Sequence, residues 1–135
     1  MQCVFCGDVT KSGEVVHESA HAWVVLHDDW ALRGHAMIVA RRHVQNVSDL
    51  TEHEWEHFHR VWRRAERALL KATETERVIV MKLGIATPHL HVHLYPVMNG
   101  TNRDDVFAAI DAKTNVPRDE QLVHKLRELL TPPGH

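Results

Sequence analysis

The chain has 135 residues and a mass of 15.5 kDa, the size of one ordinary domain, and 44% hydrophobic residues are enough to build a buried core. A formal charge of −2 gives no positive field for a nucleic-acid polymer, and no apolar run approaches the roughly 20 residues that cross a bilayer. We therefore expect neither a nucleic-acid nor a membrane partner. The first residues lack the basic and apolar segments of a secretory signal, which predicts a cytoplasmic location.

Five short apolar runs have the character of strands. Residues 15–16 and 22–26 are separated by a polar turn and predict a β-hairpin. Residues 35–40 are followed by two arginines and predict a central strand. Residues 78–81 and 90–97 are separated by a segment too short to hold a helix, so they predict antiparallel neighbours.

Helical periodicity appears in the middle and at the end of the chain. Thr51 and Glu54 have the spacing of a capping box, in which a hydroxyl and a carboxylate each satisfy an exposed backbone amide at a helix start. Apolar residues at three-and-four spacing follow at 55–69 and predict a helix of roughly twenty residues with one buried stripe. Residues 103–112 and 119–130 predict two further helices.

No internal repeat, low-complexity tract or Gly/Ser linker divides the chain, so these strands and helices share one core. We predict a single α+β domain over residues 1–135. Its architecture is a mainly antiparallel sheet of about five strands with one long helix packed on it. Residues 1–100 form the core with the motif, and residues 101–135 form a helical C-terminal extension.

Histidine is unusually abundant, with 13 copies, and three of them lie in one strictly alternating segment. In an extended strand His89, His91 and His93 project from one face, while the apolar residues between them face the core. Neutral imidazoles in such a row can ligate a metal and leave a position for water. Alternatively, one imidazole can attack phosphorus while its neighbours donate hydrogen bonds to phosphoryl oxygens. Spacing alone does not choose between these chemistries.

The segment from His89 to Tyr95 resembles, at every position, the His-φ-His-φ-His-φ-φ motif of the histidine-triad family of nucleotide hydrolases and transferases, where φ is apolar. Residues 33–44 resemble the family's Gly-His, apolar strand and basic-basic-His segment, and the Cys-x-x-Cys start also recurs there. The resemblance is closest to the branch described as dinucleoside polyphosphate hydrolases. It implies a homodimeric enzyme that cleaves dinucleoside polyphosphates or nucleoside phosphoramidates at the α-phosphate.

The resemblance also implies roles for single residues. His91 would attack the α-phosphorus and form a nucleotidyl-histidine, which water then hydrolyses. His93 and His35 would hold the phosphate oxygens and stabilise the charge of the transition state, a task that suits preorganised donors.

Four residues are candidates for contacts with the rest of the nucleotide. The family commonly carries an acidic or amide residue for the ribose hydroxyls eight positions before the Gly-His histidine, and here that position is His27, followed by Asp28. Trp30 lies in the loop before that histidine, where it can cover a nucleobase. Thr87, just before the triad, can supply the hydroxyl that many members have there.

The two cysteines, Cys3 and Cys6, exclude a disulfide framework and favour a metal clip or a redox pair. Two cysteines that close on two distant histidines make a Cys₂His₂ set, which is typical of structural zinc. Zinc-binding relatives of the family, including the galactose-phosphate uridylyltransferases, imply His43 and His89 as the other two ligands. Two reduced, metal-free thiols are the alternative.

Two other functions remain open at this point. A metal-dependent hydrolase would use all three histidines of the strand as a catalytic zinc site. A non-catalytic module would bind nucleotide without turnover. Elsewhere, His53 and His57 share one face of the long helix, where a metal is possible but a solvated surface is favoured. His21 has no partner in sequence that suggests chemistry.

Overall fold

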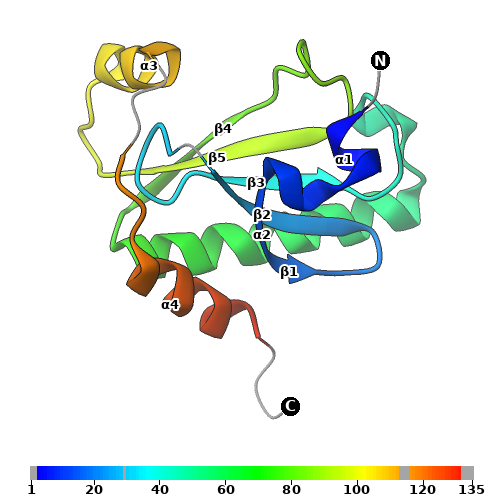
Figure 1. The fold of residues 1–135 in the computed structure, drawn as a ribbon, viewed down its shortest axis with the longest axis horizontal. Helices are drawn as coiled ribbons and strands as arrows, with labels where there is room; N and C mark the ends of the chain where they lie inside the picture. The colour runs from blue at the N-terminus through cyan, green and yellow to red at the C-terminus, as the bar shows by residue number, and fades with distance from the viewer. Residues whose placement is uncertain (1–2, 29, 113–115, 132–135) are drawn as a thin grey trace.

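A computed structural model describes residues 3–28, 30–112 and 116–131, and its centre is one five-stranded antiparallel sheet (Figure 1). The strands stand in the order β1-β2-β3-β5-β4. Their bounds are β1 (Gly13–Glu18), β2 (Ala22–His27), β3 (Ala36–Ala40), β4 (Arg77–Met81) and β5 (His91–Val97). The α+β class, the number of strands and their antiparallel pairing are confirmed.

Two strands, β3 and β5, begin one residue later than predicted, and backbone hydrogen bonds explain the late start of β5. Leu90 lies outside β5 because its N–H donates to the carbonyl of Val44 at 2.6 Å, while its own carbonyl accepts from Ala40 at 3.0 Å. The chain before β5 is therefore tied to both ends of the segment that leaves β3. This tie places His89 beside the loop that carries His43.

The helices are α1 (Val4–Gly7), α2 (Glu52–Thr73), α3 (Arg103–Ala112) and α4 (Glu120–Leu130), with short 3₁₀ turns at Val9–Ser12 and Val47–Asp49. The predicted capping box starts α2. Thr51 Oγ1 accepts from the N–H of Glu54 at 3.1 Å, and Glu54 Oε1 accepts from the N–H of Thr51 at 2.9 Å. Among the α-helices of the described residues, α1 alone, which is a single turn, has no counterpart in the prediction.

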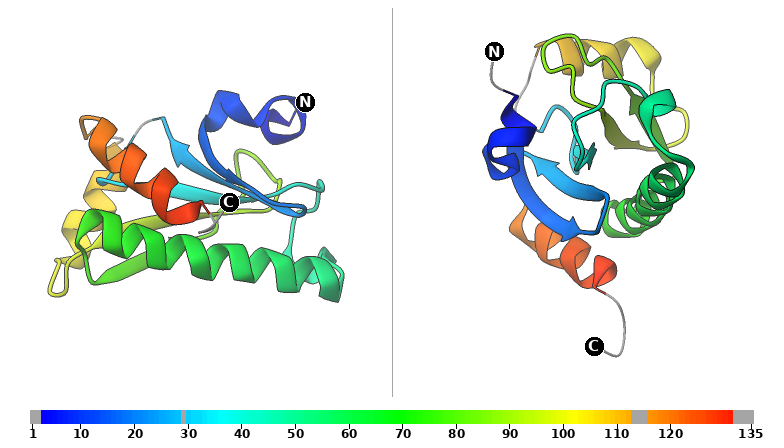
Figure 2. Two further views of the ribbon diagram at one scale, coloured as in Figure 1. Left: turned by 90° about the horizontal axis from the view of Figure 1, so that it is seen from below. Right: turned by 90° about the vertical axis from the view of Figure 1, so that its right-hand side faces the viewer.

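The sheet carries an apolar cluster on each face, because successive side chains of a strand alternate between faces. Val24, Ile38 and Leu94 pack toward α2 and α4, whereas Val25 and Met37 pack toward α1. Figure 2 shows α1 and α2 on opposite sides of the sheet. The sheet thus has one thick core under α2 and a thinner one under the N-terminal segment.

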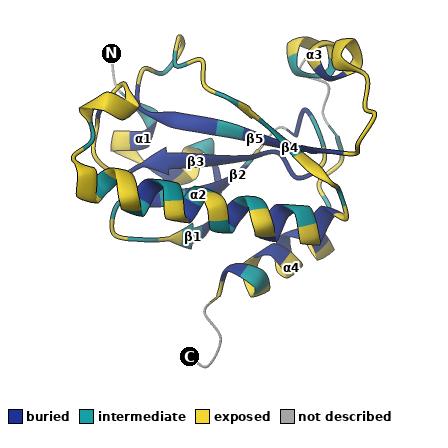
Figure 3. Ribbon diagram, turned by 180° about the vertical axis from the view of Figure 1, so that it is seen from behind, coloured by how far each residue is buried: buried dark blue, intermediate teal, exposed yellow. Residues whose placement is uncertain are grey.

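The helical C-terminal extension is present, and α4 contributes to the main core. Leu122, Leu126 and Leu130 are buried in the cluster that α2 forms with the sheet. Figure 3 shows the buried and exposed stripes that this packing leaves along α2. Within the predicted extension, residues 113–115 and 132–135 lie outside the described part. Among the described residues, no helix combines the length and the apolar character needed to cross a membrane.

Candidate functional site

The triad strand β5 lies between β3 and β4, so its side chains are fixed from both sides. His91 is paired with Val39 of β3, and His93 is paired with Met37. These two histidines face the α1 side of the sheet, while Val92 and its apolar neighbours face α2. The predicted alternation is therefore present in the structure, and it puts the two imidazoles outside the main core.

A cavity of about 660 Å³ opens on this face, bounded by residues of α1, the segment before β5 and the sheet. The residues that line it include His27, Asp28, His35, Thr87, His91 and His93. The structure thus brings together all three predicted catalytic histidines and three of the four predicted substrate contacts. Two exposed apolar side chains, Leu83 and Ile85, stand at its rim.

His91 is held in one tautomer by the backbone. Its Nδ1 lies 2.6 Å from the carbonyl oxygen of His89, and because a carbonyl only accepts, Nδ1 carries the proton. In the neutral ring Nε2 then keeps its lone pair. Burial lowers the pKa of His91, which favours this neutral form. The ring is packed against Phe5, whose centroid lies 4.8 Å away.

His35 and His93 form a hydrogen-bonded pair beside His91, with Nε2 of His35 2.9 Å from Nδ1 of His93. Burial, followed by the nearby His91 and His27, lowers the pKa of His93 to about 4. His35 follows Gly34, which has a φ of +83°, and a Cβ there would lie 2.8 Å from Thr73. Glycine at this position therefore lets the chain pass close to α2 before His35 turns into the cavity.

The predicted substrate contacts fall into two groups. His27 stacks on His35 with centroids 4.5 Å apart and planes at 7°, and Asp28 and Thr87 also line the cavity. Trp30 is only 1% exposed, belongs to the main core and is not among the residues that line the cavity. In this structure the indole of Trp30 therefore packs into the main core, outside the cavity in which we expect a nucleotide to bind.

Two aromatic residues of the site were not singled out from the sequence. Tyr95 lies 4.3 Å from His35 between ring centroids, and burial raises its pKa. Its position is two residues after His93, so the period-two rule already puts it on the same face. Phe5 contacts both His89 and His91, and it lies between the two cysteines in sequence.

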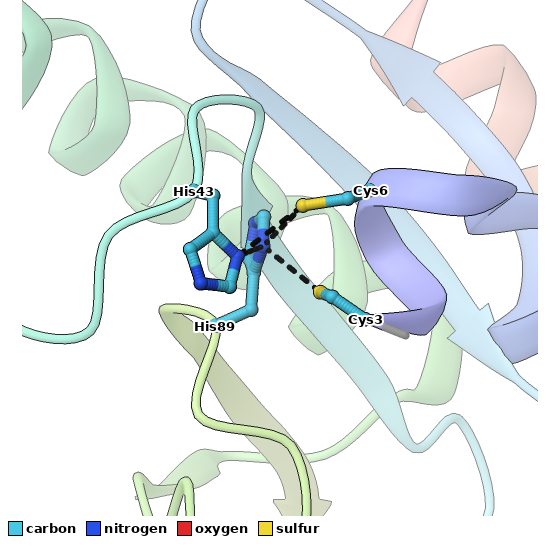
Figure 4. Close-up of side chains that lie close together, drawn as sticks. All are labelled: Cys3, Cys6, His43 and His89. Carbon is cyan, nitrogen blue, oxygen red and sulfur yellow. Dashed lines mark hydrogen bonds between the residues drawn. The ribbon is translucent and has the colours of Figure 1, made fainter. Parts of the chain in front are cut away.

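A second cluster lies at the other end of the triad and consists of Cys3, Cys6, His43 and His89 (Figure 4). Nδ1 of His89 lies 3.3 Å from Sγ of Cys3, 3.5 Å from Sγ of Cys6 and 3.0 Å from Nδ1 of His43. Sγ of Cys6 lies 3.2 Å from the same nitrogen of His43. These atoms converge from α1 and the residue before it, the loop after β3 and the segment before β5.

The donor set fits a tetrahedral zinc ion. Thiolate and imidazole ligands of such an ion lie about 3.3–3.8 Å from one another, close to the separations found here. His89 Nε2 lies 2.5 Å from the carbonyl oxygen of Ala40, so Nε2 carries the proton and Nδ1 presents its lone pair to the two sulfurs. A histidine ligand that donates its second N–H to a carbonyl is the usual outer-shell arrangement of zinc sites. All four predicted metal-ligating residues are therefore close enough to hold one ion.

The fold is shared with several solved structures. The chain matches a histidine triad protein from Bradyrhizobium japonicum with a TM-score of 0.75 and 19% identity, covering 93% of this chain and 96% of that one. It matches a histidine triad nucleotide-binding protein, described as hypothetical, from Sulfolobus tokodaii with a TM-score of 0.70 and 21% identity, covering 95% and 91%. A Zn-bound histidine triad family protein from Mycobacterium smegmatis matches with a TM-score of 0.65 and 22% identity, covering 96% and 94%.

Sequence comparison gives the family itself. No curated protein sequence matches the chain significantly. The family model of the HIT (histidine triad) domain matches residues 10–100, which is more than half of the chain. The match includes Gly34 and His35 before β3 and the whole triad strand. The chain therefore belongs to the HIT domain family.

Proposed function

We propose that the protein is a nucleotide hydrolase or nucleotidyl transferase that acts on the α-phosphate of dinucleoside polyphosphates or nucleoside phosphoramidates. The observation that carries the proposal is the fixed ring of His91. Its Nδ1–H is committed to the carbonyl of His89, so Nε2 is the free nucleophilic atom of a residue that lines the cavity. Buried neutral imidazole beside further imidazole donors is an arrangement suited to attack on phosphorus.

The proposed reaction has two displacements. Nε2 of His91 attacks the α-phosphorus, a P–N bond forms, and the bond from phosphorus to the leaving group breaks, so that the leaving group takes the electron pair. Water then attacks the same phosphorus, the P–N bond breaks, and the nucleoside monophosphate leaves with release of one proton. A second nucleophile in place of water would make the reaction a transfer.

The pair of His35 and His93 would stabilise the phosphoryl oxygens. When Nε2–H of His35 donates to Nδ1 of His93, the neutral His93 ring keeps its own proton on Nε2, which can donate to a ligand oxygen. His27, stacked on His35, would hold that ring in place while Asp28 and Thr87 contact the nucleoside. Donors fixed in this way stabilise developing charge better than mobile water.

In this proposal the second cluster binds a zinc ion that has a structural role. Cys3, Cys6, His43 and His89 would hold it, and the ion would tie the single turn α1 to the sheet. Phe5, which packs against His91, would thereby be fixed as part of the cavity wall. The geometry does not favour the alternative, a catalytic zinc bound by His89, His91 and His93. Nδ1 of His89 lies against the cysteines, and among the described residues His89 shares no candidate metal site with His91 or His93.

The test is a search for the covalent intermediate by mass spectrometry after brief incubation with dinucleoside polyphosphates. Wild type and His124→Asn, a matched change of an exposed histidine on α4, should gain one nucleotidyl group, whereas His91→Asn and His91→Gly should gain none. Nucleotide binding without an adduct or turnover in wild type would instead identify a non-catalytic nucleotide-binding module. Normal turnover by both His91 variants would remove His91 as the nucleophile.

We also propose that two copies of the chain form a homodimer. β4 is an edge strand of the sheet, and its Val80 is exposed. Light scattering on the purified protein should give twice the chain mass of 15.5 kDa, and the single chain mass at all working concentrations would contradict this.

A further inference from the structure

A third group of histidines lies outside both clusters described above and consists of His21, His53 and His57. His21 precedes β2 in the turn that follows β1, while His53 and His57 lie four residues apart in the first turns of α2. One ring nitrogen from each lies within 4.8 Å of the other two. The topology thus brings a histidine from a remote turn to a pair that already shares one helix face.

The rings meet edge to face rather than stacked. Centroid distances are 5.2 Å from His21 to His53, 4.9 Å from His21 to His57, and 4.5 Å from His53 to His57, with interplanar angles of 62–87°. Two imidazole nitrogens on one tetrahedral ion lie about 3.3 Å apart, so small rotations about the side-chain bonds bring the three nitrogens to that separation. His53 is exposed, so water can reach the group.

We propose that His21, His53 and His57 form a second metal site, which takes a divalent transition metal that prefers imidazole, namely Zn²⁺, Cu²⁺ or Ni²⁺. Three neutral nitrogens and no carboxylate are a poor donor set for Mg²⁺ or Ca²⁺, which require oxygen ligands. Three protein ligands leave a fourth position, which water fills.

The sequence around the pair has the His-Glu-x-x-His spacing that places two zinc ligands and a general base on one helix in metallopeptidases. Here Glu54 is not available as a base. Both its oxygens accept from the guanidinium of Arg42 at 2.8 Å, and one also accepts from the backbone N–H of Thr51. The spacing therefore provides the metal ligands without the base, and the site holds a metal without peptidase chemistry.

An ion at this site would join the turn before β2 to the start of α2. The same turn is already linked to the loop after β3, because the backbone N–H of Arg41 donates to the carbonyl of His21 at 3.0 Å. That loop also carries His43 of the Cys₂His₂ cluster. The second metal would therefore clamp the end of the molecule at which the first cluster is assembled.

The test counts metal ions on the full chain after chelator treatment and reloading with Zn²⁺ or Ni²⁺. The double variant His53→Asn/His57→Asn should bind one ion fewer than wild type, and the matched variant His59→Asn, on the same helix but outside the group, should bind as many as wild type. The Cys3→Ser/Cys6→Ser variant should keep the ion at the histidine site. An equal count for wild type and the double variant would overturn the proposal.

A second measurement locates the ion without relying on a count. In NMR spectra, substoichiometric Cu²⁺ should broaden the imidazole signals of His21, His53 and His57 together, and Glu54→Gln should not change this. If the ion broadens His53 alone, or broadens unrelated exposed histidines such as His124 as strongly, the three residues do not form a specific metal site. Neither measurement depends on nucleotide turnover, so the test of the second metal site is independent of the proposed enzyme function.

Discussion

His89 and His91 are two residues apart on the same face of one segment, yet the structure commits their rings in opposite ways. Nε2 of His89 donates to the carbonyl of Ala40, which leaves Nδ1 for the thiols of Cys3 and Cys6. Nδ1 of His91 donates to the carbonyl of His89, which leaves Nε2 free beside the cavity. The comparison shows that the backbone carbonyl in reach of a ring determines which nitrogen is available for chemistry.

The largest expected effect separates catalysis from metal binding. His91→Asn should lower kcat about 10³-fold or more, because it removes the proposed nucleophile, while the zinc content stays equal to that of wild type. Steady-state kinetics and elemental analysis of the same preparation measure both quantities. Loss of zinc together with activity would show that the two histidines do not have separate roles.

The reciprocal change sharpens the comparison. His89→Asn should release the zinc ion and lower the free energy of unfolding by about 3 kcal/mol or more, because it removes a buried ligand and leaves the carbonyl of Ala40 without its donor. Chemical denaturation and zinc analysis are the measurements. Folded His89→Asn should still gain the nucleotidyl adduct, and its failure to do so while His91 stays in place would place His89 in the chemistry.

The depressed pKa of His93 gives a pH-dependent effect at the catalytic end. The folded protein keeps His93 neutral down to about pH 4, whereas the unfolded chain protonates it below its ordinary value of 6.5. The unfolded state therefore binds more protons between these values, so stability falls as the pH drops from 6.5 toward 4, by at most about 3 kcal/mol for this residue.

His93→Asn removes that contribution, and the difference between wild type and variant cancels the other titrating groups. Denaturation curves at pH 7, 5.5 and 4 should show the unfolding free energy of wild type falling more steeply than that of the variant. Parallel pH dependence of the two proteins would mean that His93 is not buried in its neutral form.

The smallest effect provides a baseline for stability losses that involve no histidine. Thr51→Ala removes the hydroxyl that caps α2 and should lower the unfolding free energy by about 1 kcal/mol, with zinc content and kcat unchanged. Thr51→Ser keeps the hydroxyl and should restore most of the loss. A changed kcat in Thr51→Ala would show that the start of α2 is coupled to the cavity.

The sequence predicts the elements that follow strong periodic patterns. The capping box of Thr51 and Glu54 locates the start of α2, and the alternation of residues 89–94 places the triad face. Single-turn α1 has too few residues to show a period, so its contribution of Phe5 to the cavity wall is not predictable.

Other features depend on contacts between remote segments. The burial of Trp30 depends on how its loop packs into the main core, and an aromatic residue in a loop is equally compatible with either position. His21 meets His53 only because the turn before β2 folds onto the start of α2. The ring orientations of His89 and His91 likewise depend on backbone carbonyls whose positions are set by strand pairing.

The most direct test of the opposite ring orientations is long-range ¹H–¹⁵N NMR of the histidine side chains at neutral pH. The structure predicts that His91 carries its proton on Nδ1 with Nε2 unprotonated, and that His89 carries its proton on Nε2. Spectra in which both rings carry the proton on the same nitrogen would contradict the separate assignment of metal binding to one and nucleophilic attack to the other.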